Sequence, residues 1–147
     1  MNPSPLTALS PLDGRYHGKV AALRPCFSEY ALIRHRVQIE IAWFKALSWE
    51  PAIREVPIFS ASTIAQLDDL VTNFSEADAE AVKIIEGRTN HDVKAIEYWL
   101  KQRLAQNSEV AAAVEFIHFA CTSEDINNLA YGLMLQDART QCILPAL

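Results

Sequence analysis

Glycine is scarce in this chain, and none of its four glycines stands in a G-x-G or G-K-[ST] pattern. The glycine-rich loops that bind nucleotide phosphates are therefore absent. The G-x-S-x-G turn that presents a nucleophilic serine is absent as well. These absences exclude the local motifs of nucleotide-hydrolysing and hydride-transfer enzymes.

Cysteine is also rare, since the chain has only Cys26, Cys121 and Cys142. An odd, widely spaced set gives neither a disulfide framework nor a pair of metal ligands, and no zinc pattern joins the histidines. We expect three buried, reduced thiols and a cytoplasmic protein.

Basic residues are outnumbered, with 13 Lys and Arg against 18 Asp and Glu, a formal net charge of −5. Because no basic stripe is present, we expect no nucleic-acid partner. No uncharged stretch exceeds 12 residues, and the one at residues 56–67 contains Ser, Thr, Gln and Pro, so we expect no membrane span.

Strand signals are weak, whereas apolar residues recur at helical spacing along most of the chain. We therefore predict an all-α fold with short connections. Polar capping residues mark where the predicted helices start. The six predicted helices begin after Ser28, after Ser60 or Ser62, after a capping box of Ser75 and Asp78, at Asp92, at Asn107 or Ser108, and near Ser123.

The predicted third helix runs to Gly87, and the predicted fifth helix continues to Cys121. Helical spacing would place Glu115, His118 and Thr122 on one stripe of the fifth helix. We expect Glu115 to orient the imidazole of His118. In the simpler alternative, His118 is a histidine at the edge of the core that Glu115 satisfies.

The last predicted helix has an apolar face and no stop signal. This pattern predicts an N-terminal part of a longer protein, against the alternative of a complete small bundle with a frayed end. Exposure of the face would promote self-association. Its apolar residues are Leu129, Leu133, Ile143, Leu144 and Leu147.

Three polar segments are candidate sites. The turn at Asp13 and Gly14 would present Arg15 and Tyr16 side by side, a pair suited to a phosphate or carboxylate. Alternatively, this is a surface turn with a solvated arginine. The second segment, residues 89–92, precedes a helix start that offers free N–H groups. Its alternative is simple capping by Asn90 or Asp92.

The third segment, residues 122–128, lies between two apolar runs. Thr122 and Asp125 resemble a capping box with Asp in place of Glu, which explains the start of a helix. Capping does not explain Asn127 and Asn128, because asparagine is a poor helix former. We expect a polar group to face these two residues.

Together these segments resemble the N-terminal part of the adenylosuccinate lyases, a family of the fumarase and aspartase superfamily. The resemblance runs from about residue 7 to the end of the chain. Its blocks, in order, are SPLDGRY at 10–16, FSEY at 27–30, TNHDVKA at 89–95 and EFIHFACTSEDINNL at 115–129.

The resemblance implies an all-α homotetramer with a central bundle of long helices, of which this chain holds only the start. It implies β-elimination that splits adenylosuccinate into AMP and fumarate, and likewise SAICAR into AICAR and fumarate, with no metal or organic cofactor. Residues 1–147 would form a single, incomplete N-terminal helical domain.

The resemblance also implies which residues bind substrate. His118 matches a histidine near the family's active site. The general acid, a histidine, and the general base, a serine on a mobile loop, are expected after Leu147, so the chain alone is expected to be inactive. The implied substrate-binding residues are Arg15, Tyr16, Asn90, His91, Asp92, Thr122 and Ser123.

Two other functions fit parts of the pattern. Another fumarate-releasing enzyme, such as an argininosuccinate lyase, shares the superfamily, although the TNHDVK block favours the purine enzyme. A non-catalytic helical interaction module would leave Asn127, Asn128 and the Arg15-Tyr16 turn without a role.

Overall fold

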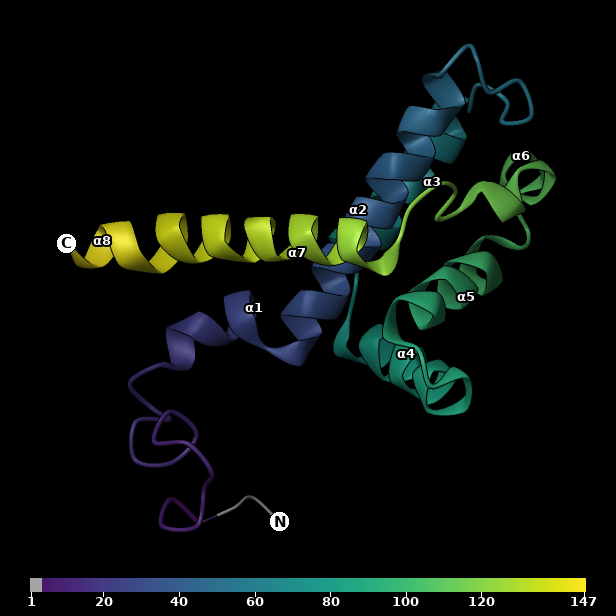
Figure 1. The fold of residues 1–147 in the computed structure, drawn as a ribbon. Helices are drawn as coiled ribbons and strands as arrows, with labels where there is room; N and C mark the ends of the chain where they lie inside the picture. The colour runs from purple at the N-terminus through teal and green to yellow at the C-terminus, as the bar shows by residue number, and fades with distance from the viewer. Residues whose placement is uncertain (1–3) are drawn as a thin grey trace.

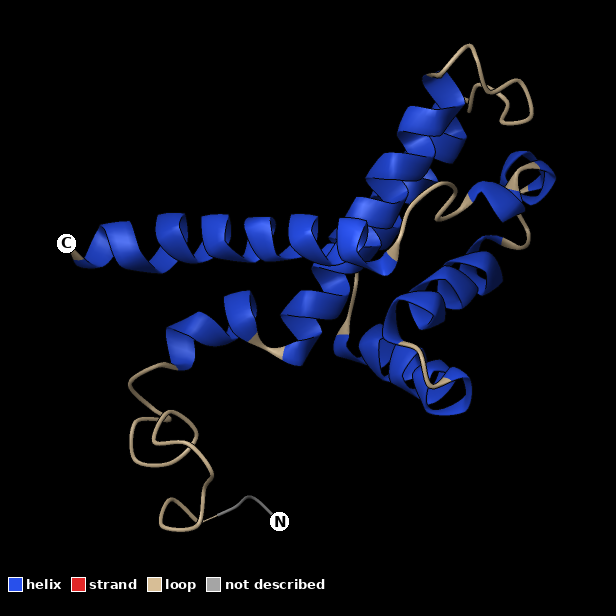
Figure 2. Cartoon of the chain, in the orientation of Figure 1, coloured by secondary structure: helices blue, strands red, loops and turns tan. Residues whose placement is uncertain are grey.

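Helices make up all the regular structure in the computed structural model, which describes residues 4–147 and contains no strand within that range (Figures 1 and 2). The prediction of an all-α fold is confirmed. The helices are η1 (Ala21–Leu23), α1 (Arg24–Phe27), α2 (Glu29–Trp49), α3 (Ala61–Thr72), α4 (Glu76–Thr89), α5 (Asp92–Leu104), α6 (Ser108–Ala112), η2 (Val114–Phe116), α7 (Ser123–Ala138), the π-helical turn η3 (Arg139–Ile143) and α8 (Leu144–Ala146).

Side-chain caps start three of the long helices as the sequence predicts. The Ser28 hydroxyl accepts from the Ala31 N–H at 3.2 Å, and the Ser60 hydroxyl accepts from the Thr63 N–H at 3.3 Å. Ser75 and Asp78 form the predicted capping box. Each cap satisfies a backbone donor that the first helical turn leaves free. Helix α4 runs to Thr89, two residues beyond the predicted end.

Helix α2 lies at the centre of the molecule and packs against α3, α4, α5 and α7 (Figure 1). Its apolar face includes Phe44, whose ring contacts that of Phe59 at a centroid distance of 4.9 Å. On the neighbouring side, Phe74 meets Trp99 edge to face. This core also encloses two charged residues of α2, Arg36 and Glu40, which are 4% and 0% exposed.

The predicted fifth helix begins after Asn107 as expected, but its predicted extent is wrong. It breaks into α6 and η2, and residues 117–122 are irregular. His118 and Ala120 have left-handed backbones, with φ of 65° and 59°. Tertiary contacts outweigh the helical pattern here. The Trp43 indole donates to the Phe119 carbonyl at 2.8 Å, and Glu40 binds the His118 ring.

The thiol prediction holds only in part. Cys26 is buried at 1% exposure, whereas Cys121 and Cys142 are half-buried. Among the described residues, no helix combines the length and hydropathy needed to span a membrane.

Helix α7 crosses α2 and continues through η3 and α8 as a projecting arm, drawn in yellow in Figure 1. Its predicted apolar face is largely exposed. The exposed fractions lie between 49% and 97% for Leu129, Ile143, Leu144 and Leu147, whereas Leu133 is half-buried.

We predict that this exposed face makes the chain associate with itself, because water contact with contiguous apolar surface is unfavourable. Sedimentation should give a species heavier than the 16.4 kDa monomer. Leu144→Glu should shift it towards the monomer, whereas Ile58→Glu, a matched change of an exposed residue on the loop between α2 and α3, should not. A wild-type chain that sediments as a clean monomer would contradict this prediction.

Candidate binding site at the starts of α5 and α7

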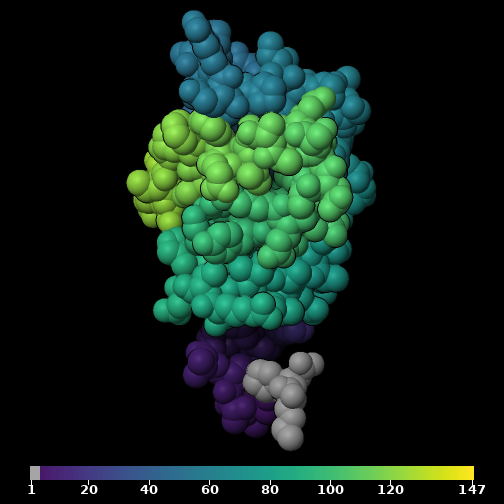
Figure 3. Space-filling model, turned by 90° about the vertical axis from the view of Figure 1, so that its right-hand side faces the viewer, coloured from purple at the N-terminus to yellow at the C-terminus, as the bar shows by residue number. Residues whose placement is uncertain are grey.

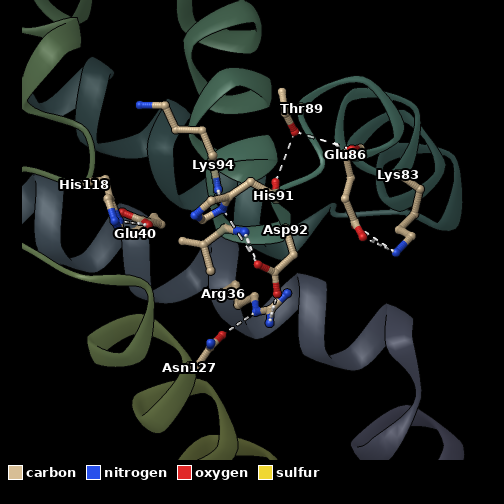
Figure 4. A network of polar contacts seen from close by, with 11 residues as sticks. Arg36, Glu40, Lys83, Glu86, Thr89, His91, Asp92, Lys94, His118 and Asn127 are labelled. Atoms are coloured by element: carbon tan, nitrogen blue, oxygen red, sulfur yellow. Dashed lines mark hydrogen bonds and ion pairs between the residues drawn. The ribbon is translucent and has the colours of Figure 1, made fainter.

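Arg36 joins three helices through one buried guanidinium. Its Nη2 lies 2.6 Å from Asp92 Oδ2 at the start of α5, and its Nε donates to Asn127 Oδ1 on α7 at 2.8 Å (Figure 4). The planar fork of arginine suits two acceptors that approach from different directions. Arg36 therefore sets the distance between the starts of α5 and α7.

Asp92 is the first residue of α5 and is not its cap, which corrects the sequence prediction. Its Oδ1 accepts from the Val93 N–H at 2.8 Å, and its Oδ2 accepts from Arg36. Partial burial raises the pKa of this carboxyl, but the Val93 N–H and Arg36 together outweigh burial, so the pKa lies below its ordinary value of 3.8. Asp92 therefore stays ionised at neutral pH.

His91 caps α5 instead. Its Nδ1 accepts from the Lys94 N–H at 3.1 Å, so a neutral imidazole must carry its proton on Nε2. The side chain is 52% exposed and can offer this Nε2–H to a ligand. Asn90 before it adopts a left-handed backbone with φ of 52°, which asparagine tolerates well, and this turn joins α4 directly to α5.

Thr122 and Asp125 start α7 as predicted. The Asp125 carboxylate accepts from the Thr122 N–H at 2.7 Å. Thr122 is exposed and Ser123 is half-buried. The expected polar partner is found for Asn127, which faces Arg36. Asn128 instead lies on the exposed side of the helix.

His118 is oriented by Glu40 and not by Glu115, so this prediction is wrong. The His118 Nδ1 lies 2.6 Å from Glu40 Oε1. Glu115 is 80% exposed and pairs with Lys101 at 2.8 Å. The helical spacing that suggested Glu115 does not exist, because the backbone leaves the helix before His118.

Arg15 and Tyr16 form the predicted pair, with the guanidinium 4.8 Å from the centre of the phenol ring. However, their segment lies beyond α1, far from the starts of α5 and α7 (Figure 1). The chain by itself therefore brings together the second and third predicted segments and His118, but not the first.

The surface view shows how these parts lie next to each other. In Figure 3, α6 and the residues after it lie across the middle of the face, beside the start of α7 and above α5. The N-terminal segment lies at the bottom of the same view. Within residues 4–147, no group of three or more His, Cys, Asp or Glu side chains could hold a metal ion.

Sequence reasoning missed Arg36 and Glu40. A signal was available, because both charges fall within the apolar face of α2 that includes Ile33, Val37 and Ile41. Charged residues are almost never fully buried unless they are paired, so such positions indicate partners elsewhere in the chain.

Comparison with known proteins identifies the family to which the chain belongs. A family model described as Lyase matches residues 14–147. The chain belongs to this lyase family. Its fold class agrees with the all-α fold that the family resemblance implied.

Individual relatives give a narrower likeness. The chain is 57% identical over 145 residues to an adenylosuccinate lyase of Escherichia coli, and 55% identical over the same length to that of Haemophilus influenzae. It is 51% identical over 142 residues to that of Legionella pneumophila. These matches cover 97–99% of the chain but only 31–32% of each relative. The chain thus spans about a third of the length of the curated relatives it matches.

We predict that Arg36→Met destabilises the chain by about 2–3 kcal/mol, because Asp92 and Asn127 lose a charged donor. Met keeps much of the buried stem. The matched control, Arg34→Met, removes a pair with Asp137 at 3.5 Å and should cost at most about 1 kcal/mol. Urea unfolding followed by circular dichroism measures both. Equal losses would show that Arg36 has no special role.

The lowered pKa of Asp92 predicts a pH-dependent contribution to stability. Its folded pKa lies below its ordinary value, so the stabilisation is present above about pH 4 and is lost as the pH falls through the folded pKa. The wild type should therefore be more stable than Asp92→Asn at about pH 7, and this difference should shrink at about pH 3. An unchanged difference would contradict the assignment.

Proposed function

We propose that this chain supplies one wall of the substrate site of an adenylosuccinate lyase. Such an enzyme cleaves adenylosuccinate to AMP and fumarate, and SAICAR to AICAR and fumarate, by β-elimination. Support comes from the similarity over almost the whole chain to enzymes of that name. All the relatives named above are adenylosuccinate lyases, which favours a purine substrate over argininosuccinate.

The observation that carries the proposal is the Arg36 contact with Asp92 and Asn127. It holds two helix starts close together, and a helix start offers unpaired N–H groups and a partial positive charge. The substrate carries a phosphate and two succinyl carboxylates. Because Arg36 offsets the charge of Asp92, the acidic side chain at this position does not repel such an anion strongly.

Each binding residue then has a defined task. Asn90 and the Nε2–H of His91 donate to substrate oxygens in front of α5. The hydroxyls of Thr122 and Ser123 donate at the start of α7. Asp92 binds Arg36 and so fixes the first turn of α5. Through this contact it positions the start of α5 for the substrate.

The acid–base chemistry lies elsewhere in this proposal. β-Elimination needs a base for the Cβ proton and an acid for the leaving nitrogen. We assign these roles to a serine and a histidine outside residues 1–147. Neither a metal nor an organic cofactor takes part.

Arg15 and Tyr16 fit the proposal only in an assembly. They are distant from the other binding residues within one chain, so they would contact substrate in a site of another subunit. The exposed apolar face of α7 and α8 supports assembly, and we propose a homotetramer. A cytoplasmic location accords with three free thiols.

We predict that the 147-residue chain binds adenylosuccinate without cleaving it. In amide NMR spectra, adenylosuccinate should shift residues 90–95 and 122–126, whereas argininosuccinate should not. Ser123→Ala should weaken the response. Fumarate released above background would refute the assignment of acid and base, and amide shifts confined to other residues would refute the assigned wall.

A further inference from the structure

Glu40 is the most deeply buried charged side chain among the described residues. It is 0% exposed, and its Oε1 lies 2.6 Å from His118 Nδ1. Its second oxygen, Oε2, is also buried and has no hydrogen-bond partner. A buried oxygen without a hydrogen-bond partner is costly, so the arrangement requires an explanation.

The loop that carries His118 is held in an unfavourable shape. His118 and Ala120 both have positive φ, and each such residue costs about 1–3 kcal/mol. Two contacts from α2 hold the loop, namely Glu40 to His118 and Trp43 to the Phe119 carbonyl. Residues in such conformations cluster at ligand sites, where surrounding structure maintains them.

The proton positions follow from this geometry. One proton must lie between Oε1 and Nδ1, since otherwise two acceptors would face each other. The remaining choice is whether Nε2 also carries a proton. With that proton the buried pair is electrically neutral overall, and without it the pair carries a full negative charge. A proton on Nε2 therefore avoids a buried net negative charge.

One neighbouring charge, that of Glu97, acts in the same direction as burial. Burial raises the pKa of the Glu40 carboxyl and Glu97 on α5 adds to this, while His118 opposes it. Lys94 and Lys101 contact Glu97 at 2.7 Å and 3.1 Å and offset part of its charge. The half-buried Cys121 thiol lies on the loop after His118.

We propose that Glu40 is a positioning residue, which holds His118 so that its Nε2–H serves as a donor to an anionic oxygen of the ligand. Nδ1 is turned towards the buried carboxyl, while 18% of the His118 side chain remains exposed. Figure 4 shows this pair beside α5, on the side where His91 and Lys94 also lie. The ligand part of this inference rests on the proposed function, whereas the Glu40–His118 arrangement does not.

The test compares Glu40→Gln with Glu115→Gln in the 147-residue chain. The amide of Glu40→Gln keeps the shape of the carboxyl and can accept from Nδ1–H or donate to Nδ1, but a neutral partner no longer favours a second proton on the ring. The ¹⁵N resonances of the His118 ring at about pH 7 should therefore change from two protonated nitrogens in the wild type to one in Glu40→Gln. Both nitrogens should stay protonated in Glu115→Gln, which alters the exposed residue paired with Lys101.

The second measurement is the affinity of each variant for adenylosuccinate. Losing a charge-assisted bond should weaken adenylosuccinate binding by about tenfold or more in Glu40→Gln and leave it unchanged in Glu115→Gln. Ring ¹⁵N resonances that are identical in wild type and Glu40→Gln would overturn the inference. If the resonances change as expected but the wild type does not bind adenylosuccinate, the proposed function fails while the assigned role of Glu40 in setting the ring's protonation stands.

Discussion

The contact of the Arg36 guanidinium with Asp92 and Asn127 is the interaction on which the candidate site depends. Helices α5 and α7 are separated in sequence by α6, η2 and an irregular loop. The rigid guanidinium of Arg36 on the central helix contacts both of them directly. Because Arg36 is buried, removing either partner would leave charge or polar groups unsatisfied, which makes the arrangement specific as well as stable.

One turn further along α2, Glu40 positions the ring of His118, just as Arg36 positions the starts of α5 and α7. Arg36 and Glu40 are four residues apart, so both project from the same side of α2. The central helix thus has two functions. Its apolar residues build the core, and two charged residues within that core position polar groups that other segments of the chain supply.

The sequence predicted what local chemistry controls. Ser28, Ser60, Ser75 and Thr122 start helices where expected, because a side chain and a backbone N–H three residues apart suffice for a cap. The sequence-based prediction failed where contacts between residues far apart in the chain determine the local conformation. His118 follows helical spacing in the sequence, yet its loop is not helical, and contacts with Glu40 and Trp43 stabilise the irregular conformation. Asn127 was expected to face a polar group, but only the fold could identify Arg36.

The geometry explains what these positions can do physically. Amide hydrogen exchange in Asn127→Ala tests the coupling of the two helix starts through Arg36 most directly. Asn127 is linked to the start of α5 through Arg36, so the variant should lose protection both at residues 123–127 and at residues 92–96. Lost protection confined to α7, with α5 unchanged, would contradict the claim that Arg36 couples the two helix starts.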